Sequence, residues 1–121
     1  MLPKAAMSIY NSIISATKGI YPEPASWYIV DAMIKTKITI INNLGLHARA
    51  SAKFVSTAAK YQSHIDVIKN SQTVNGKSIM GVMMLAANKG SELILEIDGP
   101  DEEQMNQALI DLINDYFGEG E

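Results

Sequence analysis

The spacing of apolar and polar residues predicts four strands and three helices in the part of the chain that begins at Met33. Residues 35–41 alternate in polarity and are rich in Ile and Thr, which is typical of a half-buried strand. In residues 92–98 the apolar side chains also alternate, so that one face of the strand is apolar. Two shorter strands are predicted at residues 65–69 and 73–74. The apolar positions of the fourth strand are Leu93, Leu95 and Ile97.

Helical periodicity predicts three further elements, at residues 48–60, at 79–85 and after Gly99-Pro100. The first helix is expected to present Ala52, Val55 and Ala59 on one face, with Phe54 and Ala58 beside them. The last helix begins with an acidic turn, which the helix dipole favours. That turn is assigned to Asp101, Glu102 and Glu103. Its buried stripe is predicted to consist of Met105, Leu109, Leu112, Ile113 and Tyr116.

The order of these elements is βαββαβα, which indicates an α+β fold. Strands and helices in this order favour a four-stranded antiparallel sheet with the helices covering one face, an open-faced sandwich. Residues 33–121 are expected to form this single domain. Residues 1–32 contain the helix-breaking Pro22-Glu23-Pro24 and are interpreted as an extension or linker. We expect Met33 to be the natural start; the alternative is a real, partly helical arm in which Ala6 and Ile9 share an apolar face.

Composition excludes several classes of function. The chain has no cysteine, which rules out disulfides and thiol catalysis and suits a reducing cytoplasm. Its net charge of -3 argues against general nucleic-acid binding. No stretch is long and apolar enough to span a bilayer, and no cofactor is expected. The charge is uneven, because residues 98–121 contain eight acidic residues and no Lys or Arg, whereas four basic residues cluster near two helix starts. These are Arg49, Lys53, Lys60 and Lys77.

His47 lies where the first strand gives way to a helix, and this position favours phosphoryl chemistry. The N-terminus of a helix presents unpaired N–H groups and a positive dipole end, and both hold anions. Arg49 lies two residues further on and offers a charged donor to a phosphate. A histidine nucleophile beside such an anion site is able to carry a phosphoryl group. The competing interpretation is a surface histidine that only caps the helix.

The second histidine, His64, has no partner pattern and is interpreted as structural. Two histidines in unrelated contexts make a metal site improbable. Ser78 is predicted to cap the second helix, and a phosphate at that position would be stabilised by the helix dipole. Gly76-Lys77-Ser78 matches the end of a P-loop, but position 71 is Ser where that motif needs Gly, so nucleotide binding is discarded.

Three methionines fall within five residues of the second predicted helix. Methionine is adaptable and is common on surfaces that bind several partners. Met80 and Met83 are expected to border an exposed apolar patch, while Met84 is expected to face inward with Leu85.

Two motifs together resemble a known family. Gly45-Leu46-His47-Ala48-Arg49, followed by residues 74–83 (Val-Asn-Gly-Lys-Ser-Ile-Met-Gly-Val-Met), is similar to HPr, the histidine-containing phosphocarrier of the bacterial phosphoenolpyruvate-dependent phosphotransferase system. The resemblance covers residues 33–121 and implies that His47 accepts a phosphoryl group on Nδ1 from Enzyme I and passes it to a histidine of an EIIA domain. Arg49 matches the arginine that neutralises the phosphate.

The resemblance also implies regulation and docking. Ser78 matches a serine that an HPr kinase/phosphorylase modifies in many bacteria. The residues that match the partner-docking surface are Ala48, Ser51, Ile79, Met80 and Met83. One position departs from the family, because most members have Pro where this chain has Ala50. Two alternatives remain open: a phosphorelay whose output is regulatory without sugar transport, and an interaction module in which Ser78 is modified and His47 is idle.

Overall fold

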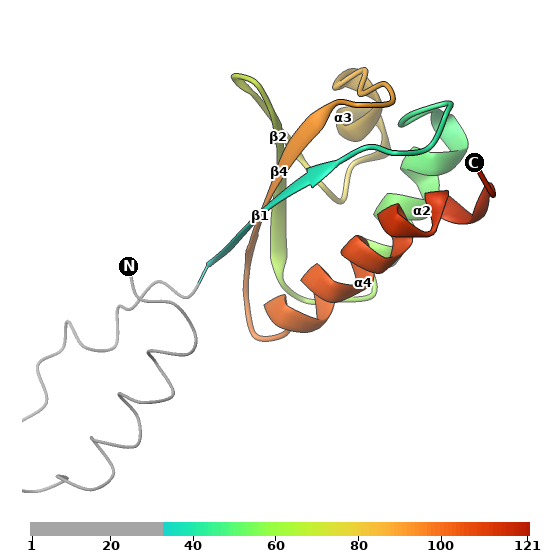
Figure 1. The fold of residues 1–121 in the computed structure, drawn as a ribbon. Coiled ribbons are helices and arrows are strands. Elements are labelled where there is room, and N and C mark those ends of the chain that lie inside the picture. The colour runs from blue at the N-terminus through green and yellow to red at the C-terminus, as the bar shows by residue number, and fades with distance from the viewer. Residues whose placement is uncertain (1–32) are drawn as a thin grey trace, which may run out of the picture. The chain divides into compact units, whose positions relative to one another are not determined.

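The computed structural model describes residues 33–121, and the predictions for residues 1–32 lie outside the described residues. All seven predicted elements are present, with ends that differ from the predicted ones by a few residues at most (Figure 1). The strands are β1 (Ile34–Thr39), β2 (His64–Lys69), β3 (Gln72–Asn75) and β4 (Glu92–Asp98). The helices are α2 (Ala48–Ala58), α3 (Ile79–Met84) and α4 (Glu102–Asn114), followed by a short 3-10 turn, η2 (Tyr116–Gly118).

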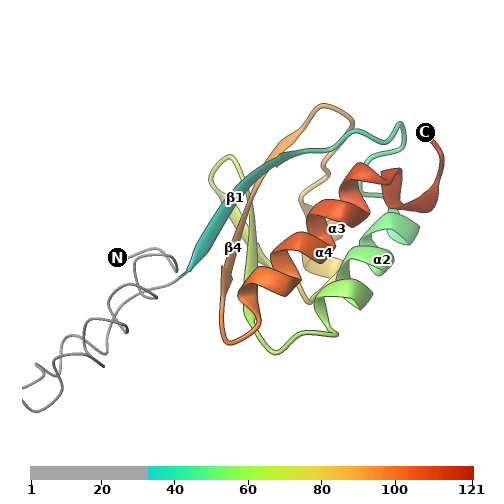
Figure 2. The same ribbon diagram turned by 60° about the horizontal axis from the view of Figure 1, so that its bottom comes forward.

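The four strands form one antiparallel sheet in the order β1-β4-β2-β3, so the α+β prediction is confirmed. The strand β4 lies in the middle and pairs with β1 on one side and with β2 on the other. Its register places Leu93 opposite Ile38 and Leu95 opposite Val67, which brings apolar side chains of three strands to the same face. The three helices cover that face together (Figures 1 and 2).

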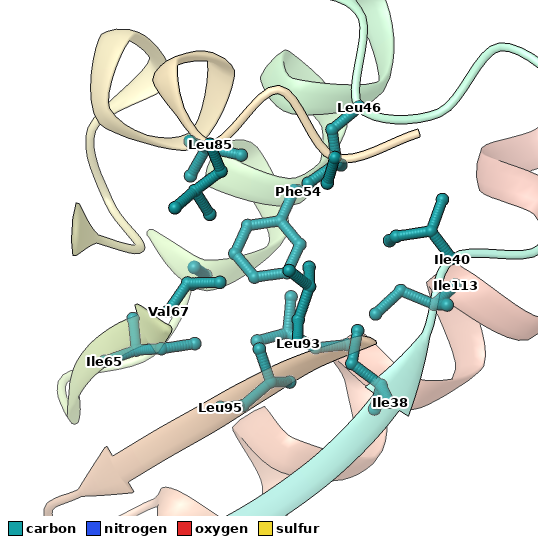
Figure 3. Packing of buried hydrophobic residues seen from close by; sticks show 14 of the residues in the cluster. Ile38, Ile40, Leu46, Phe54, Ile65, Val67, Leu85, Leu93, Leu95 and Ile113 are labelled. Carbon is teal, nitrogen blue, oxygen red and sulfur yellow. The ribbon is translucent and has the colours of Figure 1, made fainter. Parts of the chain in front are cut away.

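The core lies between the sheet and the helices, and Phe54 of α2 occupies its centre (Figure 3). The alternation predicted for β4 is confirmed, since Leu93, Leu95 and Ile97 are buried. The predicted face of α2 is rotated from the observed one. Its buried residues are Ala50, Ser51, Phe54 and Ala58, whereas Ala59 is exposed. The bulky Phe54 ring selects the face that turns inward, because burying it stabilises the fold by more than burying alanine.

The end of α4 differs from the prediction. Tyr116 was expected in the buried stripe, but it is exposed, and Phe117 is buried instead. The helix ends at Asn114, and the backbone then adopts positive φ angles of 56° at Tyr116 and 53° at Phe117. This left-handed turn breaks the helical spacing and directs the segment after it back toward α2.

Asp101 performs a different task from the one predicted. It precedes the first residue of α4 and makes no side-chain bond to that helix. Its carboxylate instead accepts hydrogen bonds from the backbone N–H groups of Gln62 (2.8 Å) and Ser63 (2.9 Å) and from the Ser63 hydroxyl (2.5 Å). The Ser63 hydroxyl and then the Gln62 N–H lower the pKa of Asp101. The carboxylate therefore ties the α2–β2 loop to the start of α4.

We expect Asp101→Asn to lower the melting temperature at neutral pH. The donors of Gln62 and Ser63 now bond to two carboxylate oxygens, whereas an amide side chain would offer them only one oxygen. Since the pKa of Asp101 is lowered by folding, its stabilisation is complete above the ordinary Asp pKa and is lost as the pH falls through the folded value. The difference between the two proteins should therefore shrink in acid. Glu103→Gln, which removes a charge from the same helix end, serves as the control in thermal unfolding. A gap that is the same at every pH would contradict this explanation.

Candidate functional site

A tight loop between β1 and α2 positions His47. The side-chain amide of Asn42, which is buried, donates to the Gly45 carbonyl at 2.9 Å and closes the loop. Gly45 has a φ of +67°, a conformation that favours glycine. The N–H of buried Leu46 then donates to the Ala87 carbonyl at 2.8 Å, which ties the loop to the segment after α3. These contacts fix His47 as the residue that caps α2.

The two nitrogens of the His47 ring have different partners. Nδ1 accepts a hydrogen bond of 3.2 Å from the backbone N–H of Arg49, so the lone pair of Nδ1 faces the N-terminus of α2. Nε2 contacts the Glu119 carboxylate. The His47 side chain is 28% exposed, which leaves the ring accessible from solvent. The predicted position of His47 at a helix start is therefore confirmed, while its expected role in phosphoryl transfer is a separate question.

Glu119 is a residue of the site that sequence reasoning missed. One of its oxygens contacts His47 and the other accepts a 2.9 Å hydrogen bond from the Asn42 amide. Burial raises the pKa of Glu119, but the hydrogen bonds from Asn42 and His47, together with the positive charges of protonated His47 and of Lys53, lower it to below its usual range. Glu119 lies 72 residues after His47, so no local motif could have identified it.

Two cations accompany this carboxylate. Arg49 and Lys53 line a cavity of about 330 Å³ together with Leu44 and the C-terminal residues Gly118, Glu119 and Glu121. The ammonium group of Lys53 donates to the Phe117 carbonyl at 2.6 Å and holds the C-terminal segment against α2. Figures 1 and 2 show this end of the chain beside the start of α2. The cavity contains charges of both signs, and its member Glu119 is the residue that contacts His47.

Ser78 lies at a different place in the fold. Its hydroxyl oxygen accepts a 3.1 Å hydrogen bond from the Gly81 N–H, so the predicted cap of α3 is confirmed. The neighbouring Lys77 donates to the Tyr61 carbonyl, just beyond the C-terminal end of α2, at 2.7 Å. Lys77, the residue before Ser78, therefore contacts the segment just after the C-terminal end of the 11-residue helix α2, whereas His47 caps the opposite end of that helix. Of the four basic residues, Arg49 and Lys53 line the cavity that contains Glu119, whereas the Lys77 side chain lies beyond the C-terminal end of α2.

The apolar surface of α3 is larger than predicted. Ile79, Met80 and Met83 are exposed, and Met80 retains 70% of its accessible area. Met84 was expected to face inward, but it is 66% exposed, because Val82 and Leu85 occupy the buried side of this short helix. Leu44, in the loop before His47, is also exposed. We call the exposed side chains of Ile79, Met80, Met83 and Met84 the α3 patch.

Two residues assigned to docking on the α2 side differ in accessibility. Ala48 is exposed at the first turn of α2. Ser51 is fully buried, and its hydroxyl donates to the Leu46 carbonyl at 3.1 Å. The assignment of Ser51 to a docking surface is therefore wrong, because a partner cannot reach it. Its small side chain instead holds the His47 loop against α2.

The remaining histidine does not join the site. His64 is the first residue of β2, is exposed, and contacts the Asp66 carboxylate at 3.1 Å. Within residues 33–121, no group of three or more His, Asp or Glu side chains is arranged to hold a metal ion. No helix in this part of the chain has the length and apolarity that a membrane crossing requires.

Residues 34–115 match a family model described as the HPr component of the phosphotransferase system (PTS), phosphorylation site. The chain belongs to the HPr family. HPr proteins are phosphocarriers of the phosphotransferase system, and this HPr-family chain therefore works with the enzymes of that system.

Curated relatives and solved structures agree with this assignment. The phosphocarrier protein HPr of Neisseria meningitidis serogroup A is 62% identical over 89 residues, which cover 74% of this chain and all of the relative. The HPr of Cupriavidus necator is 54% identical over the same length. The crystal structure of HPr from Thermoanaerobacter tengcongensis superposes with a TM-score of 0.69 at 48% identity and covers 71% of this chain and 97% of that one. An HPr structure from Bacillus anthracis gives a TM-score of 0.66 at 36% identity, covering 69% and 99%.

Proposed function

We propose that this chain carries a phosphoryl group on Nδ1 of His47, which it accepts from Enzyme I and passes to a histidine of an EIIA domain. The observation that carries the proposal is the orientation of the ring. Nδ1 presents its lone pair at the N-terminus of α2, where free backbone N–H groups and the helix dipole stabilise a phosphate. Attack on phosphorus replaces the bond from the Arg49 N–H, and this N–H then becomes free to donate to a phosphate oxygen.

Arg49 is proposed to neutralise the transferred group. Arg49 is exposed two residues after His47 and lines the cavity that also contains Glu119, so the guanidinium is able to reach a phosphate from solvent. Phosphoryl transfer depends mainly on positioning and charge stabilisation, both of which a rigid loop and a helix start provide.

The proposal is tested by intact-mass analysis of residues 1–121 after incubation with Enzyme I and phosphoenolpyruvate. We expect one phosphoryl group per chain, lost on brief acid treatment, as a phosphoramidate is. An established HPr is incubated in parallel to show that Enzyme I is active. If that control is phosphorylated and this chain is not, the carrier function is refuted.

The α3 patch is proposed as the docking surface for Enzyme I, for EIIA domains and for an HPr kinase/phosphorylase that modifies Ser78. A flat apolar patch with basic residues at its edge suits partners that bind briefly and then leave. Lys77 lies directly before the patch and gives it a basic edge. Ser78 adjoins the patch in sequence, and its O–H remains available because the hydroxyl uses only its oxygen in the cap. A modified Ser78 would therefore place its charge next to every docked partner.

Ser78→Asp is expected to slow phosphoryl acceptance from Enzyme I at least fivefold, since about 1 kcal/mol of repulsion on docking gives that factor. Position 78 lies toward the far end of α2 from His47. The charge introduced there should therefore act mainly on docking of the partner and only weakly on the phosphate at His47. Ser78→Asn is the matched control, because asparagine has nearly the same shape as aspartate and also caps a helix, but carries no charge. Initial rates measured at several salt concentrations should converge at high salt. Equal slowing by both substitutions would assign the effect to the cap and refute control by charge.

A regulatory output without sugar transport is the second candidate, and the cap at Ser78 with the adjoining α3 patch is the feature that favours it. Identifying which EIIA domains accept phosphate from this protein would distinguish the sugar-transport output from the regulatory one.

We further propose that residues 33–121 are the functional unit and that this unit works in the cytoplasm, because its lack of cysteine suits a reducing compartment.

A further inference from the structure

The contact between Glu119 and His47 is not explained by the packing of the C-terminal segment. That segment is already held by the bond from Lys53 to the Phe117 carbonyl and by a 3.2 Å bond from the Asn43 N–H to the Glu121 carbonyl. The Glu119 side chain adds two contacts that both belong to the site, one to the His47 ring and one to the buried Asn42 amide. Asn42 thus orients a carboxylate whose second oxygen meets the imidazole.

The hydrogen bonds determine where the proton of the neutral ring lies. Nδ1 accepts from the Arg49 N–H and therefore carries no proton. The proton consequently lies on Nε2, where the Glu119 carboxylate accepts it. The pKa of Glu119 is lowered, so the carboxylate stays ionised at neutral pH and keeps this role. A carboxylate that fixes the tautomer of a histidine in this way is a recurring device in catalytic sites.

We propose that Glu119 is a positioning residue for phosphoryl transfer, which keeps the proton on Nε2 of His47 both before and after the phosphoryl group arrives. The inference rests on the proposed function, in which His47 is the carrier residue. Glu119 then has two effects. It leaves Nδ1 without a proton, so that Nδ1 is the nucleophile, and it keeps the phosphorylated ring protonated at Nε2.

The chemistry balances without any proton transfer. The lone pair of Nδ1 attacks phosphorus, the P–N bond to the donor histidine breaks, and its electron pair returns to the donor nitrogen. The His47 ring then bears one positive charge, which the Glu119 carboxylate stabilises through Nε2–H. In the onward transfer the P–Nδ1 bond breaks and its electrons return to Nδ1, so the ring leaves as neutral imidazole. Without the Nε2 proton it would have to leave as imidazolate, which is a much poorer leaving group.

Other charged side chains lie near the Glu119 carboxylate. Arg49 and Lys53 of α2 and Glu121 of the C-terminal segment line the same cavity as Glu119. Lys89, in the loop before β4, donates to the Asn43 side chain at 2.9 Å. Within residues 33–121, no recorded hydrogen bond or ion pair joins these other groups to Nε2, so the Glu119 carboxylate is the one that should control its proton.

The test compares the full chain with Glu119→Gln, Glu119→Asp and Glu121→Gln. Glutamine has the same size but offers one oxygen to two donors, Asn42 and His47, and carries no charge. Aspartate restores the charge on a shorter side chain. Glu121→Gln removes the same charge from the same cavity without a bond to the ring, which makes it the matched control.

The first measurement is made on the unphosphorylated proteins. Nitrogen-15 NMR of the His47 ring should show the proton on Nε2 in the wild type and in Glu121→Gln. In Glu119→Gln the preference for Nε2 should weaken, because only the Arg49 N–H then opposes a proton on Nδ1, and Glu119→Asp should restore part of it. This readout does not depend on any phosphoryl transfer.

The second measurement is the rate at which the phosphorylated proteins lose phosphate in buffer. At neutral pH Glu119→Gln should release it on the order of tenfold more slowly than the wild type, because fewer rings are protonated at Nε2. In acid the two rates should converge, since every ring is then protonated and the Glu119 carboxylate is neutral.

The outcomes separate this inference from the proposed function. If all variants accept phosphate and Glu119→Gln shows wild-type tautomer and release rates, Glu119 has no positioning role and His47 remains the carrier. If Glu119→Gln accepts phosphate faster, the carboxylate acts as a repelling charge, and the inference is equally overturned. If the wild type accepts no phosphate while the control carrier does, the proposed function fails, and this inference fails with it.

Discussion

His47→Ala is expected to abolish phosphoryl acceptance from Enzyme I, with a loss on the order of a thousandfold or more, because it removes the only proposed nucleophile. The substitution leaves the loop intact, since the loop is held by the Asn42 side chain and by the bond from Leu46 to Ala87. Helix α2 loses its capping side chain, which costs about 1 kcal/mol and does not unfold a domain of this size. Intact-mass analysis after incubation with Enzyme I and phosphoenolpyruvate measures the result.

His64→Ala provides the matched control for this experiment. His64 is exposed at the start of β2, and its recorded side-chain contact is with Asp66 rather than with any residue of the site. It should therefore accept phosphate at the wild-type rate. Undiminished uptake by His47→Ala would overturn the proposed function and favour the interpretation in which Ser78 alone is modified. Circular dichroism of both variants shows whether a loss of uptake reflects unfolding.

Gly45→Ala is expected to destabilise the fold by about 2–5 kcal/mol and to slow phosphoryl acceptance. A φ of +67° costs an alanine roughly 1–2 kcal/mol. The added Cβ would also lie 2.4 Å from the Ala87 carbonyl oxygen and 2.9 Å from the Asn88 Cα, and such an overlap adds about 1–3 kcal/mol. Both neighbours are backbone atoms, so the His47 loop has to move away from the segment after α3, and His47 moves with it.

Gly90→Ala separates strain from overlap. Gly90 also has a positive φ, 91°, but a Cβ there meets no atom within 4 Å. It should cost only the conformational term, about 1–2 kcal/mol, and leave acceptance unchanged. Denaturant unfolding of both variants gives the difference between them. Equal destabilisation would show that the contact between the two loops does not constrain the position of His47.

The strands could be predicted from the sequence because alternation is a local property. In β4 the polar and apolar residues repeat every two positions, and the buried set Leu93, Leu95 and Ile97 matches that repeat. The pairing of β4 with both β1 and β2 is not local. This pairing arises because the helices have to cover the apolar faces of all four strands at the same time. The strand order β1-β4-β2-β3 is the result.

The helix faces were predicted less well, because small residues satisfy more than one face. In α2 the alanines gave equal support to several orientations, and burial of the Phe54 ring decided between them. In α3 the six-residue length left Met84 outside, since Val82 and Leu85 already fill the buried side. The misplaced Tyr116 has a different cause, because the left-handed turn after Asn114 has no sequence signal that periodicity detects.

By itself, the sequence determined the order of the elements, the burial pattern of β4, the caps at His47 and Ser78, and the resemblance to HPr, because each depends on residues that are neighbours along the chain. Only the tertiary structure decided that Ser51 is buried, that Ser78 lies at the far end of α2 from His47, and that Glu119 meets the imidazole. These facts depend on the path of the chain between distant residues. Packing of the whole core sets that path, and no local pattern encodes it.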